Sequence, residues 1–308
     1  MGIKEPFEKV IMDGRTLIAI LIIAILWRTY ISLDHEIALW ESMCSGIALI
    51  IFGWVLFAYL YHMSRKETGW VVSNRMFQGI AVSLTAINIY VLVYYGMRWY
   101  TLQVEVYLPY DVLLRDVRYV MLVLCYCGVI WVTRHLKEMH DSYMLLTEEI
   151  PTMRKGAVRR AFFKVITDER TAIVIIAIAF FWRASISLDR EIVLWESMCS
   201  GIALFIMGWV LFGYTGSLAR RVTRPRMVKI YHGIALALFA INIYVLVYYG
   251  MRWYSLIGVG EEMLVPLDFV FRDIRFFMVV IFYCATMVLS KWLEKAAEEC
   301  EFLVRKEA

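Results

Sequence analysis

Long apolar runs alternate with short polar segments along the chain, and their lengths are those of membrane-spanning helices. The runs cover about residues 15–33, 37–62, 76–100 and 117–135, and then about 170–188, 192–215, 229–253 and 274–293. An α-helix needs about 20 apolar residues to cross a bilayer. The pattern therefore predicts an all-α polytopic membrane protein with about eight transmembrane helices.

The second four runs repeat the first four. The letters LWESMCSGIAL occur at 39–49 and again at 194–204, and AINIYVLVYYGMRWY occurs at 86–100 and at 240–254. This self-similarity indicates gene duplication. Because each unit holds an even number of spans, we expect two parallel four-helix repeats with a pseudo-two-fold axis along the membrane normal.

Three segments follow from this repeat and from the charge pattern. We expect a first four-helix transmembrane repeat over 1–140, a basic cytoplasmic linker over 141–168, and a second repeat with a short cytoplasmic tail over 169–308. Lys and Arg cluster in the linker and in the loops near 62–75 and 217–229. Since basic loops stay on the cytoplasmic side, this distribution predicts an integral membrane protein with both termini cytoplasmic.

Differences between the two halves suggest which helices face lipid. The first helix changes freely among apolar types, from LIAILIIAIL at 17–26 to AIVIIAIAFF at 172–181, and the fourth helix also varies. The second and third helices are nearly unchanged, so we expect helices 1 and 4 to face lipid and helices 2 and 3 to pack inside. A recent duplication would also explain the identical blocks. On the second helix Gly46 and Gly53 share a face that lets another helix approach closely.

Charged residues gather near the predicted outer end of each unit. Glu41, for example, lies about 13 Å from the bilayer centre, where a charge costs less than at the midplane. The set has two interpretations: an entrance for an ion or polar solute, or an ion-pair network that satisfies buried charges. This outer charged ring consists of Arg28, Asp34, Glu41, Arg98, Arg115, Asp116, Arg118, Arg183, Asp189, Glu196, Arg252, Arg272, Asp273 and Arg275.

Two amides, Asn88 and Asn242, lie near the middle of the third helix of each half. In lipid an unpaired amide would cost several kcal/mol, so these side chains must face protein or water. Hydrogen bonding between helices is the favoured use, and a solute pathway is the alternative.

Composition narrows the function classes. The chain is 61% apolar and only 19% charged, with a net charge of +4, which excludes an ordinary soluble domain and a nucleic-acid-binding surface. No histidine is repeated between the halves and no catalytic or nucleotide motif is present, so we expect neither a cofactor nor a metal. An intramembrane enzyme is the third alternative, less favoured because no pair of nucleophile and base is visible.

The function predicted from the sequence is therefore that of a channel or transporter for an ion or small polar solute. The alternative is a structural or assembly subunit of a membrane complex, including a viral membrane component, without transport activity. The lipid bilayer is the expected partner, and a homo-oligomer or another subunit of a membrane complex is left open. Nucleic acid is not expected as a partner.

Overall fold

The computed structural model describes the helical part of the chain. It covers residues 14–32, 38–65, 71–104, 111–146, 173–175, 177–178, 181–182, 193–220, 222, 225–256, 271, 274–286, 288–289, 292–293 and 295–296. This part contains helices and no strand. The labelled helices are α2 (Gly14–Ser32), α3 (Ala38–Arg65), α4 (Val71–Val104), α5 (Asp111–Leu146), α8 (Val193–Ala219) and α9 (Pro225–Leu256).

The described helices are those of a membrane protein. Four of them are long and apolar enough to cross a bilayer, over Met43–Tyr61, Arg75–Tyr100, Cys199–Ala219 and Met227–Met251. Shorter apolar helices cover Ile18–Trp27, Val117–Thr133 and Ile274–Thr286. The prediction of a helical membrane protein is confirmed at this level, whereas the number of eight spans and the two-unit arrangement stay predictions.

Local sequence explains where some helices begin and end. Pro225 is the first residue of α9, where its fixed φ suits the helix and its missing N–H is not needed. Helix α5 continues to Leu146, six residues past the predicted linker boundary at residue 140. The rest of the predicted linker, from residue 147 on, lies outside the described residues.

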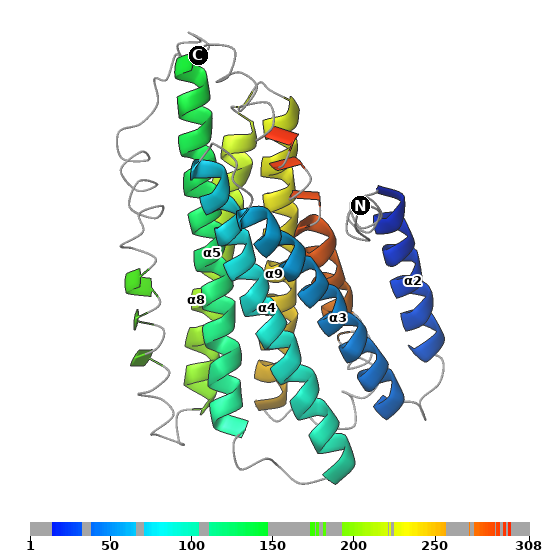
Figure 1. The fold of residues 1–308 in the computed structure, drawn as a ribbon. Helices are drawn as coiled ribbons and strands as arrows, with labels where there is room; N and C mark the ends of the chain where they lie inside the picture. The colour runs from blue at the N-terminus through cyan, green and yellow to red at the C-terminus, as the bar shows by residue number, and fades with distance from the viewer. Residues whose placement is uncertain are drawn as a thin grey trace.

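The core lies where α4, α5, α9 and the 274–286 helix meet. Helix α4 packs against α3 and α5, α8 packs against α9, and α5 also contacts α8. Figure 1 shows these helices as a bundle of long rods, with α2 standing at its edge. The largest fully buried side chains include Tyr90, Tyr126, Tyr231 and Tyr283, so the core is rich in hydroxyl groups as well as hydrocarbon.

Burial overturns part of the lipid-facing prediction. Helix 1 is exposed as expected, with Ile18 and Ile23 on α2 58% and 65% accessible. The prediction for helix 4 is wrong, because Leu122 and Cys125 on α5 are each only 1% accessible. Helix 2 is only half inside, since Ile51 on α3 is 58% accessible. The physical reason is that apolar residues of similar volume replace one another in a core at little cost, so variation among them does not report exposure.

Close helix contacts occur where the sequence places Gly46 and its counterpart Gly201. A Cβ atom added at either glycine would lie 2.7 Å from a ring carbon of Tyr95 or Tyr249, respectively. Tyr95 and Tyr249 belong to α4 and α9, so the glycines let α3 and α8 approach these helices closely. The two contacts involve the same residue types at matching places in the LWESMCSGIAL segments.

Candidate functional site

Two hydrogen bonds join distant parts of the chain at the buried asparagines. The hydroxyl of Tyr126 on α5 donates to Oδ1 of Asn242 on α9 at 2.7 Å. The hydroxyl of Tyr283 on the 274–286 helix donates to Oδ1 of Asn88 on α4 at 2.8 Å. Both asparagines are completely buried. Each amide is therefore held by a tyrosine from the other half of the sequence.

These bonds lie at membrane depth. Asn88 is at the middle of the apolar segment Arg75–Tyr100. Gly53 on α3 faces the Asn88–Tyr283 bond, and a Cβ atom at this glycine would lie 2.7 Å from the Tyr283 hydroxyl. Gly208 on α8 faces the other bond in the same way. The absence of a side chain at these glycines thus leaves room for the two amides between the helices.

The amide nitrogens are the unsatisfied part of this arrangement. The Nδ2 atoms of Asn88 and Asn242 are buried and have no hydrogen-bond partner within the described part of the chain. An amide nitrogen carries two donor hydrogens, and a buried donor without an acceptor costs about 1–3 kcal/mol. Water or a polar solute at these nitrogens would remove that cost.

A tyrosine pair joins α4 to α9 near the amides. The hydroxyl of Tyr244 donates to the hydroxyl of Tyr90 at 2.8 Å, and the two rings meet edge to face with centroids 5.5 Å apart. Tyr90 follows Asn88 by two residues and Tyr244 follows Asn242 by two. The contact therefore lies within about one helical turn of the amides along both helices.

Two arginines stack on tyrosines farther along the same helices. The guanidinium carbon of Arg118 lies 5.6 Å from the ring centroid of Tyr248, and that of Arg275 lies 5.5 Å from the centroid of Tyr94. Each pair again joins one half of the sequence to the other. Contacts of this geometry are cation–π interactions, which are stronger where water is excluded.

These groups form one set, which we call the polar column. Its middle offers hydroxyl and amide groups, and one end offers two cations. This chemistry suits the binding of a polar or anionic group, or the clamping of helices. Among the described residues, no cluster of His, Cys, Asp and Glu could hold a metal ion. The column consists of Asn88, Tyr90, Tyr94, Arg118, Tyr126, Asn242, Tyr244, Tyr248, Arg275 and Tyr283.

The outer charged ring is described only in part, so it stays a prediction. The side chains of Arg98, Arg118 and Arg275 are at least half-buried, and the last two belong to the polar column. Some ring members lie on described helices without a described side chain: Arg28, Glu41, Arg115, Asp116, Glu196 and Arg252. Others lie outside the described residues: Asp34, Arg183, Asp189, Arg272 and Asp273.

The sequence pattern indicated the two asparagines but not the tyrosines that bind them. A signal for these was present, because Tyr126 and Tyr283 each follow a matching arginine, Arg118 or Arg275, by eight residues. The fourth helices differ at most neighbouring positions but share this tyrosine.

Comparison with known proteins adds no relative, since no family model, curated protein or solved structure matches the chain.

Proposed function

We propose that the protein is a channel or transporter for an ion or small polar solute, and that the polar column is its pathway in a closed state. The supporting observation is the pair of amide nitrogens on Asn88 and Asn242, buried at membrane depth without a hydrogen-bond acceptor in the described chain. A pathway that admits water or solute supplies that acceptor. Polar side chains at this depth commonly mark such pathways.

The proposed pathway follows the pseudo-two-fold axis between two parallel four-helix units. Tyr90 and Tyr244 close it, because their hydroxyls bond to each other between α4 and α9. Exchanging this bond for bonds to a passing solute leaves both hydroxyls satisfied, so opening costs little hydrogen-bond energy. Arg118 and Arg275 stand at one end, which the predicted topology places on the outer face with both termini in the cytoplasm.

Flux measurements test this proposal. Purified protein in liposomes is assayed for common cations, anions and protons, together with Asn88→Leu/Asn242→Leu, which replaces both amides by apolar groups of similar size. We expect flux of at least one ion in the unchanged protein and a loss of ten-fold or more in the double variant. Tyr61→Phe, an exposed tyrosine on α3, is the matched control and is expected to leave flux unchanged.

The outer charged ring is tested in the same assay. Glu41→Gln/Glu196→Gln removes the two ring carboxylates that occur in the repeated LWESMCSGIAL segments. If these residues form the entrance, the double variant loses flux while its circular dichroism spectrum stays unchanged. A folded, unchanged protein that passes none of the ions would contradict the proposal.

A structural or assembly role is the second candidate. The Tyr126–Asn242 and Tyr283–Asn88 bonds favour it, because they tie the two halves together without any solute. On this alternative, Tyr126→Phe/Tyr283→Phe lowers the stability of the protein, and the folded protein has no flux to lose. The two assays together separate the candidates.

A further inference from the structure

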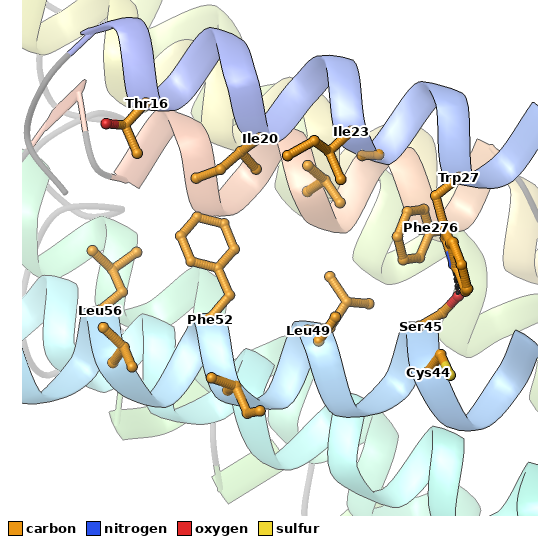
Figure 2. A pocket seen from close by; sticks show the side chains of 15 residues that line it. Thr16, Ile20, Ile23, Trp27, Cys44, Ser45, Leu49, Phe52, Leu56 and Phe276 are labelled. Carbon is orange, nitrogen blue, oxygen red and sulfur yellow. Dashed lines mark hydrogen bonds between the residues drawn. The ribbon is translucent and has the colours of Figure 1, made fainter. Parts of the chain in front are cut away.

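An apolar cavity of about 560 Å³ separates α2 from α3 and from the 274–286 helix. Figure 2 shows Ile20 and Ile23 reaching into it from α2, and Leu49 and Phe52 from α3. Phe276 closes it from the 274–286 helix. For comparison, a cavity of about 150 Å³ lined by similar side chains stays dry and binds benzene.

The cavity is elongated and lies at the depth of the hydrocarbon. Its lining extends along α2 from Thr16 to Trp27, which is about 16 Å at 1.5 Å per residue. This stretch contains the apolar helix Ile18–Trp27, and the opposite wall belongs to the span Met43–Tyr61. The shape is therefore that of an extended chain within the thickness of a bilayer.

The walls of the cavity offer almost no polar contact. Nε1 of Trp27 donates to the hydroxyl of Ser45 at 3.1 Å, so these two polar groups satisfy each other at one end. A polar ligand would lose its hydration here without gaining hydrogen bonds. An empty space of this size would forfeit dispersion contacts along three helices. The chemistry therefore selects a long, flexible hydrocarbon.

The cavity opens towards the surroundings of the bundle. Ile23 on α2 and Ile51 on α3 both line it and are 65% and 58% accessible. In a bilayer the medium at this depth consists of lipid acyl chains. The end opposite the Trp27–Ser45 bond is lined by Thr16, which precedes the apolar helix Ile18–Trp27, so this end lies nearer to the lipid headgroups.

We propose that this cavity binds one acyl chain of a membrane phospholipid, held between α2 and α3 with its terminal methyl near Trp27. Figure 1 shows α2 at the edge of the bundle, so the bound chain packs between α2 and the other helices that line the cavity. This inference is independent of whether the polar column conducts. In sequence, the second half repeats most of the residues that line the cavity. Trp182 and Ser200 occupy the positions of Trp27 and Ser45, and Nε1 of Trp182 donates to the hydroxyl of Ser200 at 3.2 Å.

Lipid retention tests the proposal. Purified full-length protein is delipidated in detergent, titrated with palmitoyl-oleoyl phosphatidylcholine and examined by native mass spectrometry. Ala48→Phe fills the cavity, whereas Ala58→Phe places the same group on the exposed face of α3. We expect the unchanged protein and Ala58→Phe to retain phospholipid, and Ala48→Phe to bind at least ten-fold more weakly at one of its sites.

A second measurement uses only the unchanged protein, so it does not depend on the variants folding. A phospholipid with a photoreactive group near the acyl terminus is crosslinked in vesicles, and the modified peptides are identified. Crosslinks concentrated on Trp27, Cys44 and Leu49 would support the proposal. Crosslinks spread evenly over exposed positions such as Ile18 and Leu92 would overturn it, as would displacement by a sterol or crosslinking to a second copy of the chain.

Discussion

Replacing Gly208 by alanine is expected to destabilise the protein, whereas the same replacement at Gly213 is not. A Cβ atom at Gly208 would lie 2.7 Å from the hydroxyl of Tyr126 and 2.8 Å from Cγ of Asn242, which is closer than side chains pack in proteins. A Cβ atom at Gly213 would meet no atom of the described residues within 4 Å, apart from its own stretch of helix. Both glycines belong to α8, so the two variants share the same change in helix propensity.

The size of the effect follows from three contributions. Overpacking costs about 1–3 kcal/mol, and loss of the Tyr126–Asn242 bond adds about 0.6 kcal/mol for an average hydrogen bond between membrane helices. The better helix propensity of alanine returns up to about 1 kcal/mol in both variants. With the full gain in propensity, Gly208→Ala should therefore lose about 0.6–2.6 kcal/mol, and the two variants should differ by about 1.6–3.6 kcal/mol because that gain is common to both.

The assay is unfolding by sodium dodecyl sulfate in mixed micelles, followed by far-ultraviolet circular dichroism. Adding Asn242→Ala to Gly208→Ala removes the amide atoms that the new methyl group meets, so the combined variant should lose less than the sum of the single losses. Equal unfolding free energies for Gly208→Ala and Gly213→Ala would refute the reasoning. That result would mean that the amide does not pack against Gly208.

Three further predictions follow from the same contacts. Gly46→Ala should lower the unfolding free energy by about 1–2 kcal/mol in that titration, because a Cβ atom there would lie 2.7 Å from a ring carbon of α4; an unchanged value would contradict the close contact. Tyr283→Phe and Asn88→Leu should be coupled by about 0.6 kcal/mol and at most about 1.7 kcal/mol, and strictly additive losses would argue against their bond. In micelles of delipidated protein, N-ethylmaleimide should modify exposed Cys44 before unfolding and should spare buried Cys125, as peptide mass spectrometry would report.

The apolar middle parts of the membrane helices could be predicted because they depend on local sequence, whereas the full length of α5, Asp111–Leu146, exceeds the predicted run at about 117–135. The apolar runs at about 37–62 and 76–100 correspond to α3 and α4, whose spans are Met43–Tyr61 and Arg75–Tyr100. An unpaired amide in lipid is costly, so the sequence also predicts a protein or water environment for Asn88. In the structure, Oδ1 of Asn88 accepts a hydrogen bond from the hydroxyl of Tyr283. Both inferences use only the residue and the solvent around it.

The arrangement of the helices could not be predicted in the same way. In a soluble protein, polarity separates the core from the surface, but in a bilayer both environments are apolar. Leu122 inside the bundle and Ile18 at its edge therefore carry the same signal. The choice of Tyr126 as the donor to Asn242 depends on which helices cross, and the two residues are 116 positions apart.

Each buried asparagine accepts its hydrogen bond from a tyrosine of the other half of the sequence, and this leads to a final prediction about assembly. A chain of residues 1–156 retains Asn88 and Tyr126 but lacks Tyr283, so as a monomer it leaves the amide oxygen of Asn88 without its donor. Two copies can restore the bond, because Tyr126 of one copy takes the place of Tyr283 against Asn88 of the other. We expect this fragment to form a homodimer in detergent, measured by light scattering after size-exclusion chromatography.

Tyr126→Phe is the variant that distinguishes dimerisation through the Tyr126–Asn88 bonds from non-specific association of an apolar fragment. It removes one hydroxyl from each copy, and therefore two equivalent bonds from the dimer, at about 0.6 kcal/mol each. The dissociation constant should rise by roughly ten-fold for these two bonds together. Tyr61→Phe removes an exposed hydroxyl from the same fragment and should leave the dimer unchanged. A fragment that is helical and monomeric at high concentration would show that each half satisfies its own amide, and the exchanged bonds would then not be what joins the two halves.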